Sequence, residues 1–303
     1  MQRHGPDWRI CYAARVPRQS LSYPTISIVG PGNLGTALAR TLSAAGYPID
    51  SIAVRPGGRS LRHARALARR AGARLATTGK QAITGDIVWV TVPDDAIAGV
   101  ALALSRSGDW SGRIVFHSSG ALTSDELSEL RSKGARVASV HPMMTFVRGE
   151  VPDMVGVAFA LEGDAIAVRA ARAIVNQLGG RPFVIKKENK VLYHVFGSFA
   201  SPLVIALLAA TERVAMEAGI RKRDIKLVME PLLQQTLRNY RKHDAAAAFS
   251  GPLVRGDVAT VRRHLGALKA LPDLEAVYVA LAKSAAKVLP VKNRRGLERE
   301  LTQ

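Results

Sequence analysis

The chain has 303 residues, of which 48% are hydrophobic, and this composition suits a globular protein of two domains. It carries 43 lysines and arginines against 24 acidic residues, a formal net charge of +19. The basic residues are spread along the chain and 5% of residues are aromatic, so no stacking platform for bases is predicted and no nucleic-acid partner is expected. The electrostatic potential of a positively charged protein attracts small anionic ligands.

Residues 1–24 are basic, lack the apolar core of a secretory signal and are predicted to be a flexible extension, with a transit-like sequence as the alternative. Cys11 is the single cysteine, so we expect no internal disulfide, no metal site and a reducing, cytoplasmic location. Residues 196–210 are the longest strongly apolar stretch, but Pro202 interrupts them and they fall short of the ~20 residues of a membrane helix. A buried helix is predicted there, and no membrane partner.

A glycine-rich sequence follows the first predicted strand, residues 25–29, and opens a helical pattern. The spacing GxGxxG in this context is typical of a dinucleotide-binding turn. Gly30 permits the tight turn, Gly32 lets the backbone approach a pyrophosphate, and Gly35 lets the helix and the strand pack closely. A glycine-rich turn that holds no nucleotide is the alternative. The predicted cofactor-binding residues here are Gly30, Gly32, Asn33, Leu34 and Gly35.

The end of the second predicted strand, residues 51–54, is basic. Arg55 stands where folds that prefer NAD usually place a carboxylate for the ribose hydroxyls. Arg55 and Arg59 are suited to hold a 2′-phosphate through paired, charge-assisted hydrogen bonds, so NADP(H) is the expected cofactor. Asp50 is expected at the far end of this strand, away from a ribose. The alternative is that both arginines belong to a solvated basic surface.

Strands and helices alternate up to about residue 187, and the pattern is entirely helical afterwards. Such alternation predicts a parallel sheet. The expected fold class is α/β, a Rossmann-like parallel-sheet domain followed by an all-helical C-terminal domain. Further strands are predicted at 74–76, 87–92, 114–117, 137–141, 157–161 and 182–185, and helices at 60–71 and 164–178. The predicted domains are a flexible basic extension (1–24), a dinucleotide-binding domain (25–187), a helical substrate or dimerisation domain (188–290) and a basic tail (291–303).

Polar residues follow three of these strands, where ligands of open α/β sheets bind. Pro93 and Asp94 are expected beside the adenosine half or the diphosphate of the cofactor. Ser118 and Ser119 are expected near the nicotinamide end, and His141 is expected to orient the substrate. The alternatives are a helix cap at Asp94, a plain polar turn at the serines, and an imidazole that only braces the fold at His141.

The helical region begins with a polar face. Lys190, His194, Ser198 and Ser201, at spacings of four, four and three, fall within one arc of a helix. Reduction of a carbonyl needs a proton donor for its oxygen, and Lys190 or His194 is suited to that role, with Ser198 and Ser201 positioning the substrate. Pro202 lies in the same pattern and predicts a kink. A solvated helix face is the alternative.

A loop at residues 250–257 interrupts the later helices. Arg255 is suited to bind a substrate carboxylate, and Asp257 to cap the next helix or hold Arg255. A plain loop between helices is the alternative.

Several motifs in order resemble one family of predicted oxidoreductases, which has a Rossmann-like domain and a C-terminal domain of unknown function. The resemblance covers residues 24–285 and rests on residues 28–35, 90–96, 117–122, 141–146, 193–194 and 251–257. Its wider relatives include pyrroline-5-carboxylate reductases, ketopantoate reductases and deazaflavin-dependent NADP reductases. The resemblance implies hydride transfer from NADPH to a small keto acid with a carboxylate, such as ketopantoate, by a homodimer.

Two alternatives remain at this point. One is reduction of a cyclic imine such as pyrroline-5-carboxylate. The other is an NADP(H)-binding sensor or regulatory protein without turnover, because a fold constrains its substrate weakly.

Overall fold

The computed structural model describes residues 23–57 and 60–302. The predicted extension, with Cys11, therefore lies outside the described residues up to position 22. The chain divides into two compact units, the first ending at Gly197 and the second beginning at Ser198. Each unit has its own buried core.

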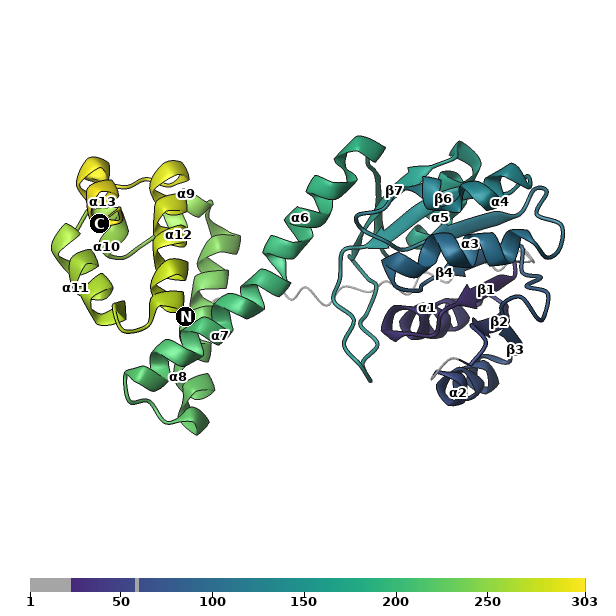
Figure 1. Cartoon of the computed structure of the whole chain (residues 1–303), viewed down its shortest axis with the longest axis horizontal. Coiled ribbons are helices and arrows are strands. Elements are labelled where there is room, and N and C mark those ends of the chain that lie inside the picture. The colour runs from purple at the N-terminus through teal and green to yellow at the C-terminus, as the bar shows by residue number, and fades with distance from the viewer. Residues whose placement is uncertain (1–22, 58–59, 303) are drawn as a thin grey trace, which may run out of the picture. The chain divides into compact units, whose positions relative to one another are not determined.

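An eight-stranded sheet forms the centre of the first unit, in the order β3-β2-β1-β4-β5-β6-β7-β8 (Figure 1). Neighbouring strands are parallel except β6 and β7, which are antiparallel. The expectation of a wholly parallel sheet is wrong at this pair, because the connection over residues 143–157 contains no crossover helix. The strands are β1 Ile26–Val29, β2 Ile49–Val54, β3 Arg74–Thr77, β4 Ile87–Val90, β5 Ile114–His117, β6 Arg136–Pro142, β7 Ala158–Gly163 and β8 Arg181–Val184.

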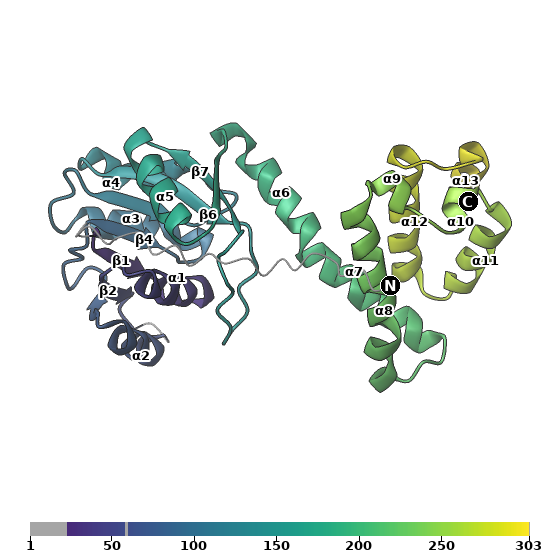
Figure 2. The ribbon, with the colours of Figure 1, turned by 180° about the vertical axis from the view of Figure 1, so that it is seen from behind.

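Helices cover both faces of this sheet, and Figures 1 and 2 show α3 and α5 on opposite sides. Successive residues of β1 and β4 face opposite cores, as Ile28 and Val29 do. A parallel strand buried on both faces is apolar throughout, which is why the sequence located these strands. One face carries α1 Asn33–Ala44, α2 Leu61–Ala71 and α5 Ala165–Gln177; the other carries α3 Ile97–Ser105, the 3₁₀ turn η2 Ser124–Leu127 and α4 Ser128–Ser132.

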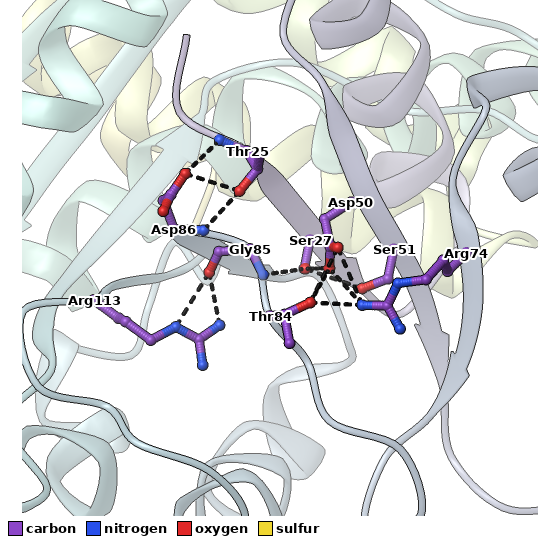
Figure 3. A network of polar contacts seen from close by, with 9 residues as sticks. All are labelled: Thr25, Ser27, Asp50, Ser51, Arg74, Thr84, Gly85, Asp86 and Arg113. Carbon is purple, nitrogen blue, oxygen red and sulfur yellow. Dashed lines mark hydrogen bonds and ion pairs between the residues drawn. The ribbon is translucent and has the colours of Figure 1, made fainter. Parts of the chain in front are cut away.

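A polar network closes the amino edge of the sheet (Figure 3). The carboxylate of Asp50 accepts hydrogen bonds from Ser27 (2.9 Å), Arg74 (3.1 Å) and Thr84 (3.1 Å). Partial burial opposes ionisation of Asp50, but the bonds from Ser27 and Arg74 outweigh it and lower its pKa. Asp50 thus lies at the amino edge, as the sequence predicts. Ligands are expected to bind at the opposite, carboxyl edge.

The second unit is helical throughout its described residues. Its small core contains Val261, Ala282, Leu297 and Leu301. The last two come from the region expected as a basic tail, where α13 packs against α11 and α12. The helices are α7 Pro202–Glu217, α8 Lys222–Lys242, α9 Ala245–Ala248, α10 Pro252–Arg255, α11 Val258–Leu268, α12 Pro272–Val288 and α13 Arg294–Glu300.

The apolar stretch at residues 196–210 is not a buried helix, so that prediction is wrong for the single chain. It falls on α6, Lys190–Ala200, and α7, which Ser201 separates. Phe196 and Phe199 are 61% and 66% exposed. The core of the second unit comes from α11 to α13, and Phe199 of that unit takes no part in it. By length and composition, the segment Lys187–Glu217 also meets the criterion for a membrane span.

Candidate active site

The glycine turn after β1 has the geometry that its spacing predicts. Gly30 has a φ of 99°, and a Cβ there would lie 2.7 Å from Val92 Cγ1. A Cβ on Gly35 would overlap the carbonyl oxygen of Gly30 and lie 2.5 Å from Thr91 Oγ1, so α1 packs closely on the turn. A Cβ on Gly32 would meet nothing within 4 Å. The backbone at Gly32 is therefore accessible to a ligand.

The N-terminus of α1 suits an anion. Gly32 is its N-cap and offers no side-chain cap, and its first turn holds no acidic residue. Amides at a helix N-terminus that lack internal partners favour phosphate groups. The side-chain Nδ2 of Asn33 donates to the carbonyl of Phe146 (2.9 Å), which ties the loop after β6 to the turn. Leu34 is half-buried against the core. These residues fit a pyrophosphate.

The carboxyl end of β2 is positively charged. Arg55 follows the strand directly and is exposed, and Arg62 is exposed on α2. Arg59 lies outside the described residues. His63 Nε2 lies 2.8 Å from Thr36 Oγ1, which links α2 to α1 beside this end of the strand. Residues 55–63 contain no carboxylate, so this end suits a 2′-phosphate better than ribose hydroxyls.

The hydroxyls of the serines after β5 are bonded within the protein. Ser118 Oγ accepts from Trp89 Nε1 (2.8 Å), and Ser119 Oγ donates to Asp94 Oδ2 (2.7 Å). Asp94 and Pro93 are exposed after β4. The alternative of a helix cap at Asp94 is wrong, because Pro93 is the N-cap of the 3₁₀ turn η1 Asp94–Ala96 and no side-chain cap is formed. These bonds fix the turn after β5. Contacts of both serines with substrate stay a prediction.

His117, at the end of β5, is a fully buried neutral imidazole. The Ser119 N–H donates to its Nδ1 (3.1 Å), so the ring hydrogen is on Nε2, which lies 2.9 Å from the carbonyl of Thr123. Burial lowers the pKa of His117 to about 4. This side chain therefore braces the turn.

Lys190, at the start of α6, is fully buried, which excludes the solvated-face alternative for this residue. Its Nζ donates to the carbonyl of Ser119 (2.8 Å) and to Ser139 Oγ (2.5 Å), and Ser139 donates to the same carbonyl (3.1 Å). Burial lowers the pKa of Lys190 to about 8, against the raising effect of Glu162 and Asp94. Sequence reasoning missed Ser139, although a serine inside the apolar strand β6 was a signal.

Two imidazoles and a phenol gather at the ends of β5 and β6. His141 Nδ1 lies 2.8 Å from the hydroxyl of Tyr193, and the ring centroids of His141 and His194 are 6.2 Å apart. A Cβ on Gly120 would lie 2.7 Å from His194 Cδ2 and 2.9 Å from His141 Nε2, so glycine is required there. Burial lowers the pKa of His141 to about 4 and raises that of Tyr193 to about 12. Sequence analysis gave Tyr193 no role.

The remaining predicted residues belong to the second unit. Ser198 lies four residues after His194 on α6, but Ser201 lies where α6 has ended, with φ −135° and ψ −80°. The expected continuous face is thus wrong at Ser201, because Pro202 starts a new helix. Arg255 ends α10 and is exposed. Asp257 caps α11 through the Thr260 N–H (3.0 Å), which confirms the capping alternative.

Two protein families match the chain. Residues 25–117 match the family described as NADP oxidoreductase, coenzyme F420-dependent. Residues 157–285 match a domain of unknown function, DUF2520. No curated protein matches.

Solved structures share the fold. BF3122 from Bacteroides fragilis, a provisionally named NADP oxidoreductase, is 22% identical, with a TM-score of 0.72 over 88% of this chain and 98% of its own. Protein TM1727 from Thermotoga maritima is 27% identical, with a TM-score of 0.66 over 91% and 99%. A reductive aminase from Aspergillus terreus, in complex with NADPH and ethyl-5-oxohexanoate, is 16% identical, with a TM-score of 0.61 over 91% and 99%.

A mostly parallel sheet with an open glycine turn and a basic β2 end defines the chain as an NAD(P)-dependent oxidoreductase. It joins an NADP oxidoreductase domain of the coenzyme F420-dependent family to the domain of unknown function DUF2520, and NADP(H) is its cofactor. This confirms the family resemblance, the fold class and the cofactor expected from the sequence.

The contrast between two glycines gives a first prediction. Gly35→Ala should destabilise the fold by about 1–3 kcal/mol, because its Cβ overlaps the turn. Gly32→Ala should leave stability unchanged and weaken NADPH binding at least about tenfold, because its methyl occupies the open space in which a pyrophosphate approaches the backbone. Urea unfolding and NADPH titration measure both. Wild-type NADPH affinity in Gly32→Ala would contradict the assigned turn.

The buried imidazoles give a second prediction. Between pH 6.5 and about 4 the unfolded state binds the proton that folded His117 resists, so stability falls as the pH falls. His117 alone accounts for about 3 kcal/mol over this range. In His117→Gln, urea unfolding should depend less steeply on pH, whereas His243→Gln, at an exposed position, should match the wild type. An unchanged slope in His117→Gln would refute the buried neutral imidazole.

Proposed function

We propose that the protein is an NADPH-dependent reductase acting on the C=O or C=N bond of a small carboxylate-bearing substrate. A keto acid such as ketopantoate is the first candidate, and a cyclic imine such as pyrroline-5-carboxylate is the second. The supporting observation is that His141, Tyr193 and His194 gather at the carboxyl edge of the sheet that carries the open glycine turn. A polar cluster beside a dinucleotide site is where a substrate of this fold is expected.

The relatives favour both substrate classes. The Aspergillus terreus reductive aminase is described with a keto ester and NADPH. A pyrroline-5-carboxylate reductase from Coxiella burnetii also shares the fold, at 18% identity and a TM-score of 0.54. A C=O and a C=N bond pose the same task to the protein, which is to hold the bond and supply a proton.

The proposed roles combine the predictions from the sequence with the positions of the described residues. Bound NADPH supplies the hydride. The N–H groups of Asn33, Leu34 and Gly35 at the start of α1 hold the pyrophosphate, and Gly30 and Gly32 shape the turn that lets it approach. Arg55 and Arg59 hold the 2′-phosphate, and Pro93 and Asp94 line the cofactor. The proposed substrate-contacting residues of the first unit are Ser118, Ser119 and His141, and the proton donors proposed from the sequence are Lys190 and His194. Ser198, Ser201 and Arg255, in the second unit, stay predictions from the sequence.

A third prediction tests cofactor and turnover together. Purified protein is titrated with NADPH and NADH, and oxidation of the cofactor is then followed with ketopantoate, other 2-keto acids and cyclic imines. Arg55→Ser should weaken NADPH binding about 10–100-fold and leave NADH binding unchanged, because it removes a charge-assisted bond to the 2′-phosphate. Arg136→Ser, at the start of β6 on the amino edge, is the matched control.

Each outcome has a distinct meaning. Turnover with one substrate class supports the reductase function and identifies the class of its substrate. Tight NADPH binding without turnover across the panel favours the sensor alternative. Equal affinity for NADPH and NADH, unaffected by Arg55→Ser, would contradict the assigned 2′-phosphate site.

We also propose that the chain acts as a homodimer. Many large apolar side chains exposed along one stretch of chain are typical of a protein interface. The exposed large apolar residues between 191 and 207 are Val191, Leu192, Val195, Phe196, Phe199, Leu203, Val204, Ile205 and Leu207. A second copy fits this surface better than a lipid bilayer, because Lys190 and Tyr193 on the same helix are buried in the first unit. A cytoplasmic location remains part of this proposal.

A fourth prediction concerns this surface. Light scattering should give twice the chain mass for the wild type, and the double variant Leu192→Glu, Phe199→Glu should be monomeric, because charges replace apolar contacts. Val155→Glu, at a 69% exposed position in the first unit, should remain dimeric. A monomeric wild type, or one that partitions into lipid vesicles, would refute the dimer.

A further inference from the structure

The proposed reduction needs a proton donor. The candidates are three side chains of α6 and one of β6, namely Lys190, Tyr193, His194 and His141. Lys190 has no exposed surface, and its Nζ donates to Ser119 and Ser139. His194 is exposed to solvent on α6. His141 is half-buried, and its Nδ1 lies 2.8 Å from the buried hydroxyl of Tyr193. Lys190 therefore has no surface that could meet a substrate, and the side chain of His194 is open to water. His141 is both held in place by Tyr193 and partly exposed, and a donor in fixed geometry is the most effective, so His141 is favoured.

The pairing with Tyr193 favours one tautomer of His141. Burial raises the pKa of Tyr193 to about 12, so its hydroxyl stays protonated and is able to donate to Nδ1. Burial, and then the neighbouring positive charge of Lys190, lowers the pKa of His141 to about 4, so its ring is neutral at pH 7. A neutral imidazole that accepts at Nδ1 carries its hydrogen on Nε2.

The Nε2 atom is placed by the turn after β5. A Cβ on Gly120 would lie 2.9 Å from it, so His141 rests directly against the bare backbone of this turn. The same turn is held on its buried side, because the carbonyl oxygen of Ser119 accepts hydrogen bonds from Lys190 and from Ser139. Lys190 therefore acts on the site through the turn.

We propose that His141 is the catalytic proton donor, presenting a neutral Nε2–H to the reacting oxygen or nitrogen of the substrate, with Tyr193 and Lys190 as positioning residues. The proposal rests on the reductase function. As the carbon of the double bond gains a hydride, the electron pair moves to the oxygen or nitrogen, which takes the Nε2 proton. Nδ1 takes the hydroxyl proton of Tyr193, so the ring stays neutral with its hydrogen on Nδ1 and Tyr193 becomes a phenolate. After the product leaves, Nε2 takes a proton from water and Nδ1 returns its proton to the phenolate, which restores the starting tautomer.

The fifth prediction begins with the protein free of cofactor. Imidazole ¹⁵N chemical shifts should show His141 neutral and protonated on Nε2 between about pH 5.5 and pH 8. Tyr193→Phe should give a mixture of the two tautomers, and Lys190→Met should raise the pKa of His141, because a neighbouring positive charge is removed. A wild-type ring protonated on Nδ1, or one that Tyr193→Phe leaves unchanged, would overturn the pairing.

Turnover supplies the second readout. His141→Gln should lower kcat about 10²–10⁴-fold with unchanged NADPH affinity, the range typical of general acid catalysis. His243→Gln, an exposed histidine of the second unit, should keep wild-type turnover. Near-normal kcat in His141→Gln, with loss in Lys190→Met or His194→Gln, would overturn the proposal and leave the reductase function standing. If the wild type reduces no substrate, the reductase function fails, while the ¹⁵N shifts still decide the tautomer.

Discussion

The buried ammonium group of Lys190 is the interaction on which the candidate site depends. It ties the start of α6 to the turn after β5 and to the middle of β6. A charge in the interior is tolerated only where polar partners replace water, and the carbonyl of Ser119 and the hydroxyl of Ser139 are such partners. The imidazole of His141 rests against the turn that this ammonium holds. The position of His141 in the cluster with Tyr193 and His194 therefore depends on a buried hydrogen-bond network.

The amino edge and the carboxyl edge of the sheet differ in whether their polar groups are bonded within the protein. At the amino edge, the bonds around Asp50 join neighbouring strands and satisfy polar groups within the protein. At the carboxyl edge, the helix N-terminus after Gly32 and the end of β2 at Arg55 remain accessible. The parallel strands β1 to β6 impose this division, because the turns that follow β1, β2, β4 and β5 all fall at the same edge. The glycine turn, the end of β2 and the cluster around His141 are thereby brought to one side.

Exposure of α6 and α7 follows from how the second unit builds its core. Val261, Ala282 and Leu297 pack against one another, and the large apolar residues of α6 and early α7 take no part in that core. A helix with apolar residues around most of its surface is stable in water only when another surface covers it. The formal charge of +19 is compatible with anionic ligands and accounts for none of this apolar area.

The sequence by itself determined the strands of the first unit, the glycine turn and the break at Pro202. These features depend on neighbours within a few residues: runs of apolar residues in buried strands, glycine spacing, and a missing N–H. Only the tertiary structure decided that Lys190 is buried, that Ser119 bonds to Asp94, and that His141 meets Tyr193. Those partners lie 71, 25 and 52 residues apart in the chain. Contacts over such separations depend on how whole elements pack, which no local pattern specifies.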